Sequence, residues 1–110
     1  MQNQQPQSRR SSRLSLEIPI NIASADPAFQ ERCHTIVVSM HGCAVLVSQN
    51  LTNGTPVVIE LDREKRSTNA RVVMSIAIGS GAGLTLLGLE FDEPGNFWGI
   101  ENPPEDWKLY

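Results

Sequence analysis

Apolar and polar residues alternate in several short segments of this chain, the pattern of strands that bury one face. The first segment covers residues 14–22. Its apolar residues share one face of the predicted strand: Leu14, Leu16, Ile18, Ile20 and Ile22. Pro19 in this segment has no amide hydrogen, so we expect it on the unpaired side of an edge, at a bulge or at a barrel corner.

Five further segments predict strands, over residues 34–39, 43–48, 55–61, 70–78 and 84–91. Gly42 lies between the first two of these, where a hairpin favours a residue without a side chain. A glycine-rich stretch separates the segments over residues 70–78 and 84–91. A phosphate-binding loop would be followed by a helix, and here a strand is predicted on each side, so this stretch is interpreted as a hairpin turn. Six short strands without a helical period predict an all-β chain, either an antiparallel barrel or a compact sandwich.

The segment after residue 91 holds most of the aromatic residues of the chain: Phe97, Trp98, Trp107 and Tyr110. A short helix is expected there, with Asn102 as its cap, Pro103 at its first position, and Glu105 and Asp106 in its first turn. We expect the aromatic residues to close one end of the fold. The alternative is an exposed cluster that docks a partner.

The length of 110 residues allows one domain, predicted over residues 9–110 and preceded by a flexible polar tail at residues 1–8. A net charge of −3 argues against binding of a nucleic acid polymer, which needs a broad basic surface. Apolar stretches fall far short of the roughly 20 residues of a membrane helix, and the N-terminus lacks the apolar core of a secretory signal. We therefore expect a cytoplasmic protein without a membrane partner.

Cys33 and Cys43 are interpreted as buried reduced thiols, because a chain able to build a core seldom needs a disulfide. With His34 and His41 they form a candidate zinc set. Cys33 and His34 are adjacent and would point to opposite faces of a strand, so we expect no metal site. Because nucleophile, base and orienting acid do not form a recognisable set, we expect neither an enzyme nor a cofactor.

Arg9, Arg10 and Arg13 are three of the nine basic residues and lie within five positions, directly before the first predicted strand. Guanidinium is planar and always charged, and its N–H groups match two phosphate oxygens or the O6/N7 edge of guanine. The cluster indicates either an anion-binding element or a solvated charged terminus.

These arginines and a second short element together resemble the PilZ domain family. Residues 9–13 correspond to its R-x-x-x-R element, and residues 37–42 to its D/N-x-S-x-x-G element, in which Ser39 and Gly42 match. The stretch "GLEFDEPGNFWGIENPPEDW" also resembles the end of a bacterial PilZ-like subgroup. The resemblance implies a six-stranded antiparallel β-barrel with a short C-terminal helical and aromatic tail.

The resemblance further implies binding of the bacterial second messenger cyclic di-GMP and signalling to a protein partner. Arg9 and Arg13 would be the main clamps on phosphates and guanine edges, with Arg10 as an auxiliary. Ser39 would offer a hydroxyl hydrogen bond, and Gly42 would keep the opposite wall free of a side chain.

Val37 departs from the family pattern, which has Asp or Asn at this position. A valine forms no hydrogen bond with a guanine N–H, and loss of one charged hydrogen bond costs about 1.5–3 kcal/mol, roughly ten- to a hundredfold in affinity. The alternative interpretation is therefore a PilZ-like adaptor that binds protein and does not bind the nucleotide.

Overall fold

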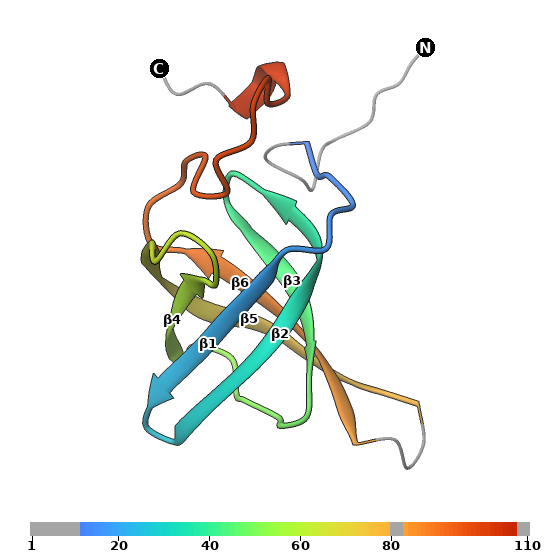
Figure 1. Cartoon of the computed structure of the whole chain (residues 1–110). Coiled ribbons are helices and arrows are strands. Elements are labelled where there is room, and N and C mark those ends of the chain that lie inside the picture. Colours follow the sequence, from blue (N-terminus) through green and yellow to red (C-terminus); the bar gives the residue numbers. More distant parts are fainter. Residues whose placement is uncertain (1–11, 80–82, 108–110) are drawn as a thin grey trace.

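A closed barrel of six antiparallel strands makes up most of the computed structural model, which describes residues 12–79 and 83–107 (Figure 1). The strands are β1 (Pro19–Ala25), β2 (Ala28–Ser39), β3 (Gly42–Val47), β4 (Pro56–Leu61), β5 (Ser67–Ile78) and β6 (Leu84–Phe91). Around the barrel they follow the order β1-β2-β3-β6-β5-β4, and β4 pairs back with β1. The predicted six-stranded antiparallel barrel is confirmed.

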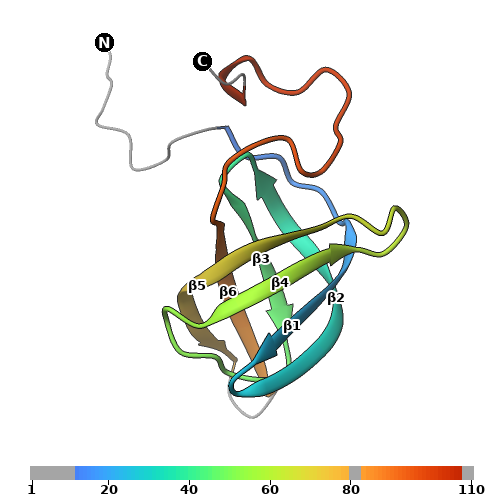
Figure 2. The ribbon, with the colours of Figure 1, turned by 90° about the vertical axis from the view of Figure 1, so that its left-hand side faces the viewer.

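Aliphatic side chains fill the interior of the barrel, because alternate positions of each strand point inward. The largest fully buried ones include Ile20, Ile22, Val38, Val45, Val47, Ile59, Val72 and Leu87. Figure 2 shows the barrel from the side of β4 and β5, with the chain crossing from β3 to β4 at one end.

The prediction of one strand over residues 14–22 is wrong in its first part. The ladder between β1 and β2 starts at the pair Pro19–His34, and the preceding residues keep only an isolated bridge at Leu14. Pro19 is the first residue of β1, where the missing amide hydrogen leaves no gap in a ladder. Leu16, expected on the inner face, is 37% exposed.

The alternation over residues 70–78 also breaks within its strand. Ala70 and Val72 are buried, but β5 shifts register against β6 between Val72 and Met74. This bulge inserts an extra residue and re-aims the side chains beyond it. Ile76 and Ile78, which follow the bulge, are consequently 47% and 37% exposed. The end of the β5–β6 hairpin extends past the barrel in Figure 1.

Residues 92–107 fold over the end of the barrel where β2 turns into β3 (Figures 1 and 2). Trp98 and Trp107 are 5% and 3% exposed and belong to the core. The rings of Phe91, Phe97 and Trp98 form a cluster with centroid separations of 5.3–5.6 Å. The expectation that these aromatic residues close one end is thus confirmed for the described ones, while Tyr110 lies outside the described residues.

The expected short helix is present, with Glu105 and Asp106 in its first turn, but it starts later than predicted. It is a single 3-10 turn, η1 (Glu105–Trp107). Asn102 adopts a left-handed φ of 54° instead of the extended conformation of an N-cap, and Pro103 precedes a second proline, which disfavours helical geometry at Pro103. Within residues 12–79 and 83–107, no helix has the length and apolar character that crossing a membrane requires.

Both cysteines are free thiols that pack against the core, but they are partly buried and not fully buried as expected. Burial raises the pKa of Cys33 to about 12, and the nearby carboxylate of Glu31 adds to the effect. Burial likewise raises the pKa of Cys43 above its usual range. Neither thiol is therefore activated as a nucleophile near neutral pH.

Candidate ligand-binding site

The segment that leads into β1 carries Arg13 and is fastened to β2. The backbone N–H of Leu14 donates to the carbonyl oxygen of Val38 at 2.8 Å, and the N–H of Val38 donates back to Leu14 at 2.9 Å. This bridge fixes the backbone beside Arg13 close to the end of β2. The arginine side chain itself is exposed.

A buried hydroxyl holds the middle of the same segment. Thr35 is 1% exposed, and its Oγ1 accepts a hydrogen bond from the N–H of Ile18 at 2.9 Å and donates to the carbonyl oxygen of Leu16. The side chain of Thr35 thus supplies bonds that a regular strand would make with backbone groups. Sequence reasoning missed Thr35, because threonine is an ordinary strand residue and its partners become apparent only from the path of residues 14–18.

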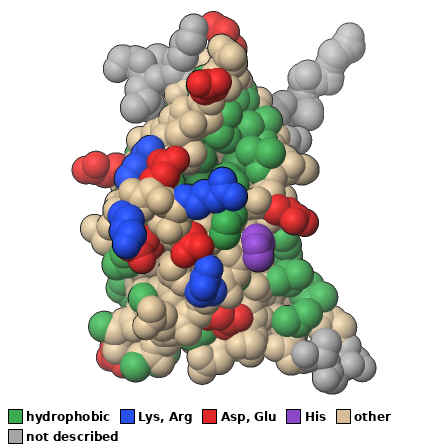
Figure 3. Space-filling view, in the orientation of Figure 1, with side chains coloured by type: hydrophobic (Ala, Val, Ile, Leu, Met, Phe, Trp, Pro, Cys, Tyr) green, Lys and Arg blue, Asp and Glu red, His purple; other side chains and the backbone are tan. Residues whose placement is uncertain are grey.

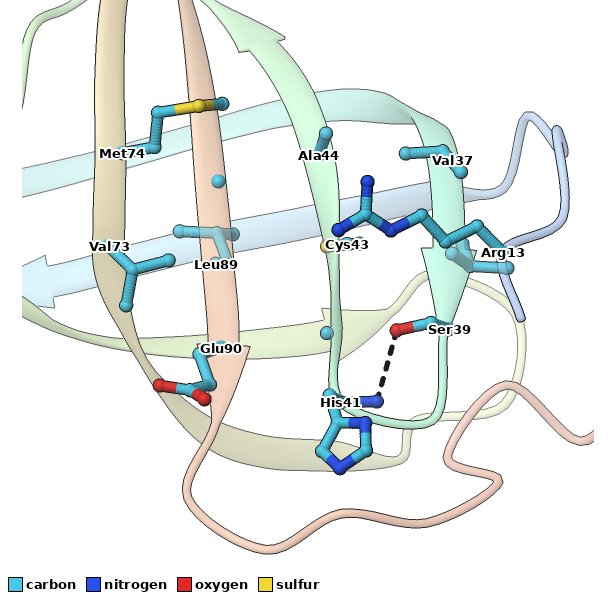
Figure 4. Close-up of a pocket in the computed structure, with 13 residues that line it drawn as sticks. Arg13, Val37, Ser39, His41, Cys43, Ala44, Val73, Met74, Leu89 and Glu90 are labelled. Carbon is cyan, nitrogen blue, oxygen red and sulfur yellow. Dashed lines mark hydrogen bonds between the residues drawn. The ribbon is translucent and has the colours of Figure 1, made fainter. Parts of the chain in front are cut away.

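The hairpin between β2 and β3 forms the facing wall. Ser39 pairs with Gly42 across the turn, and the Ser39 hydroxyl oxygen accepts a hydrogen bond from the backbone N–H of His41 at 3.1 Å (Figure 4). Such a local bond stabilises a tight turn. Because a hydroxyl has two lone pairs and one hydrogen, this bond does not exhaust the hydrogen-bonding capacity of Ser39.

Gly42 is required by the packing of β3 against β6. A Cβ atom at this position would lie 1.8 Å from the carbonyl oxygen of Leu89 and 2.9 Å from its carbonyl carbon. These are backbone atoms, so no side-chain rotation relieves the overlap. The fold alone explains this glycine, whatever its role toward a ligand.

A cavity of about 400 Å³ opens on the outer face of the barrel between the Arg13 segment and the hairpin. Its lining includes Arg13 from the first sequence element and the three motif positions of the second, Val37, Ser39 and Gly42. Figure 4 shows the side chain of Arg13 reaching over β2 toward β3, beside Val37 and Ala44. The structure therefore brings these residues together, whereas Arg9 and Arg10 lie outside the described residues.

The floor of this cavity is an apolar row of outward-facing positions. Val37 pairs with Ala44, Ala44 with Gly88, and Gly88 with Met74, so the row crosses four strands. Side chains in its middle are small or absent, which leaves a shallow surface. An apolar surface with polar groups at its rim is typical of a site that binds a planar organic ligand.

The charges around the cavity are few. Among the described residues, Arg13 is the only lysine or arginine in its lining, and Glu90 is the only carboxylate. Glu90 lies opposite Arg71 in the β5–β6 pair, and a guanidinium nitrogen of Arg71 is 3.5 Å from a carboxylate oxygen of Asp92. Among the described lining residues, Arg13 is therefore the main positive charge that would attract an anionic ligand.

A second hollow, of about 700 Å³, lies between β1, β4 and β5. It is larger, but its described lining contains Asp26 and Asp92 and neither lysine nor arginine. These carboxylates repel an anion. The smaller cavity is therefore the better candidate for a phosphate-containing ligand.

Other described side chains form no candidate metal centre, and those on the face in Figure 3 form no extended basic patch. Groups of three or more His, Cys, Asp or Glu residues able to hold a metal ion do not occur within residues 12–79 and 83–107. On the face shown in Figure 3, basic side chains are interspersed with acidic ones, and Arg32 forms an ion pair with Asp62 at 2.8 Å.

The sequence matches the PilZ domain family over residues 7–96. Comparison with curated protein sequences gives no match. Among solved structures, the PilZ domain of CeSA from a cellulose-synthesizing bacterium is similar with a TM-score of 0.53 and 26% sequence identity, over 76% of this chain and 84% of that chain.

Two larger proteins share the fold. The Bacillus subtilis inhibitor of motility, MotI/DgrA, has a TM-score of 0.60 and 20% identity over 83% of this chain, and K. pneumonia MrkH, solved as a complex with c-di-GMP, has a TM-score of 0.61 and 16% identity over 80% of this chain. The matches cover only 46% and 45% of those two chains, so this chain spans less than half of their length.

Proposed function

Because the chain belongs to the PilZ domain family, we propose that it is a signalling domain that binds cyclic di-GMP in the cavity beside Arg13. One observation carries the proposal: Arg13 and Ser39, which come from two separate sequence elements, line the same cavity. The structure of MrkH with c-di-GMP supports the choice of ligand. The role is that of a receptor and not of an enzyme.

The chemistry of the ligand fits the lining. Cyclic di-GMP carries two phosphates and two guanines, and the guanidinium of Arg13 offers paired donors to either group. The hydroxyl of Ser39 adds a hydrogen bond at the facing wall. The apolar row through Ala44 and Gly88 would accept the flat face of a guanine.

Arg9 and Arg10 complete the proposed clamp. Both belong to the same sequence element as Arg13, which lines the cavity.

Calorimetric titration with cyclic di-GMP tests the proposal, using the natural chain, Arg13→Ala and Arg32→Ala. We expect saturable binding that Arg13→Ala weakens by about ten- to a hundredfold, the value of one charged hydrogen bond. Arg32→Ala is the matched control, because Arg32 is also exposed on the barrel but pairs with Asp62 and does not line the cavity.

Equal losses in the two variants would show that only net charge attracts the nucleotide. Absence of binding in the natural chain would refute the proposal.

A protein-binding adaptor is the second candidate, favoured by two observations. Val37 removes a polar contact at the cavity wall, and apolar side chains on β5, Val73 and Ile76, are 46% and 47% exposed. If the natural chain binds no cyclic di-GMP and Val37→Asp restores binding, the adaptor function is the better account.

A further inference from the structure

The C-terminal segment binds the backbone of both elements of the proposed ligand site through its two tryptophans. The indole N–H of Trp98 donates to the carbonyl oxygen of Ser39 at 2.9 Å, and the indole N–H of Trp107 donates to the carbonyl oxygen of Ser12 at 2.8 Å. Both rings are buried. Each tryptophan therefore directs its single polar atom to one of the two sequence elements.

The contact with Ser12 is unusually complete. Besides the bond from Trp107, a carboxylate oxygen of Asp106 accepts hydrogen bonds from the backbone N–H and from the hydroxyl of Ser12, each at 3.0 Å. The amide, the hydroxyl and the carbonyl of Ser12 are thus all bound by two consecutive residues. Ser12 directly precedes Arg13.

The hairpin is held in a similar way. Three consecutive carbonyl oxygens of its turn accept hydrogen bonds from residues 91–98. These acceptors are Ser39, bound by the Trp98 indole at 2.9 Å, Met40, bound by the N–H of Gly95 at 2.8 Å, and His41, bound by the N–H of Phe91 at 2.8 Å. One segment therefore ties the hairpin wall to the arginine element.

We propose that residues 91–107, here called the clasp, hold the Arg13 segment against the hairpin before ligand binds and thereby set the affinity of the site. Trp107 and Asp106 are positioning residues in this account. Fixing the backbone in advance lowers the entropy that binding must remove. The effect on affinity rests on the proposed cyclic di-GMP function, whereas the hold on the Arg13 segment does not.

Thermodynamic reciprocity gives the clasp a second role. If an intact clasp favours binding at Arg13, then a bound ligand must stabilise the clasp by the same factor. Ligand binding in the cavity should consequently make the clasp more ordered.

Limited proteolysis tests the hold without any ligand. Trypsin cleaves after arginine, and the bond after Arg13 lies beside Ser12 and next to the bridge from Leu14 to Val38. In the full chain, Trp107→Phe keeps an aromatic ring and removes the indole N–H. We expect it to speed cleavage after Arg13 about three- to tenfold, the value of one hydrogen bond. Cleavage after Arg32, which lies within β2 and pairs with Asp62, is the internal control for general unfolding and should rise less than cleavage after Arg13.

Titration with cyclic di-GMP tests the coupling. We expect Trp107→Phe to weaken binding about three- to tenfold without changing the dependence of affinity on salt, because the substitution removes no charge. Ligand should also slow the hydrogen exchange of the Trp107 indole N–H in the natural chain.

The outcomes separate the two proposals. Unchanged cleavage after Arg13 in Trp107→Phe would overturn the clasp even if the ligand binds. Equal or tighter binding by Trp107→Phe would also overturn it. Faster cleavage in a chain that binds no cyclic di-GMP would support the hold on the Arg13 segment while the proposed ligand fails.

Discussion

Replacing Gly42 with alanine tests the account of how the hairpin wall is built. The Cβ atom would overlap the Leu89 carbonyl oxygen at 1.8 Å, and ordinary contact requires about 3.4 Å or more. The obstacle is backbone on a neighbouring strand. Accommodation therefore requires β3 and β6 to separate by more than an ångström near the Gly42–Glu90 pair.

The expected cost follows from the bonds that such a separation breaks. A backbone hydrogen bond of 2.9 Å lengthened by this amount is lost, and a buried group left without a partner costs about 1–3 kcal/mol. Disruption of one or two ladder bonds thus predicts a loss of about 2–4 kcal/mol in the free energy of unfolding. At about 4–8 °C per kcal/mol for a domain of this size, the corresponding fall in Tm is about 8–32 °C.

Urea and thermal unfolding, followed by circular dichroism, measure this cost. Gly95→Ala is the matched control, because it makes the same chemical change at a glycine whose added Cβ meets nothing within 4 Å. We expect the control to change stability by less than about 0.5 kcal/mol. If Gly42→Ala is as stable as Gly95→Ala, the close approach of β3 and β6 is wrong. Loss of ligand binding in Gly42→Ala would not show a ligand contact, since the wall itself is disturbed.

Three further substitutions or conditions give testable results. Val37→Asp should tighten cyclic di-GMP binding about ten- to a hundredfold in calorimetry, and an unchanged affinity would mean that this position does not face the ligand. Thr35→Val should lower the free energy of unfolding by about 1–3 kcal/mol in urea titrations, because the N–H of Ile18 and the carbonyl of Leu16 lose their partner. Stability should fall as pH rises from about 9 toward 12, because the Cys33 thiol ionises in the unfolded chain before it does so in the folded one, where its pKa is about 12. Urea midpoints of the natural chain and of Cys33→Ala, measured at about pH 8 and 10.5, isolate the contribution of Cys33 to this loss of stability. An equal fall of the midpoint in both proteins would contradict the prediction.

The bounds of a strand were predictable where its sequence pattern is uninterrupted. They were not predictable where contacts with another segment determine them. The segment over residues 84–91 coincides with β6, which pairs with β3 in a continuous register from Gly42 to Val47. The first strand starts at Pro19 and not at Leu14, because the preceding residues bond instead to the Thr35 hydroxyl and to Val38. Alternation in one segment carries no information on such bonds or on the bulge in β5.

The candidate site shows the same division. Arg13, Ser39 and Gly42 were candidates because of the resemblance to the two PilZ elements, and the structure places all three around one cavity. The roles of Trp98, Trp107 and Asp106 depend on the closure of the barrel end, which brings the end of the chain to its beginning. Their residue types suggested only packing and a helix start.

Amide chemical-shift mapping of the labelled chain with cyclic di-GMP tests the central claim most directly, because it reports both binding and its location. The account predicts saturable shifts at Arg13, Ser39, Ala44 and Gly88, around the smaller cavity. Shifts confined to the larger hollow between β1, β4 and β5, or an unchanged spectrum at high ligand concentration, would contradict it.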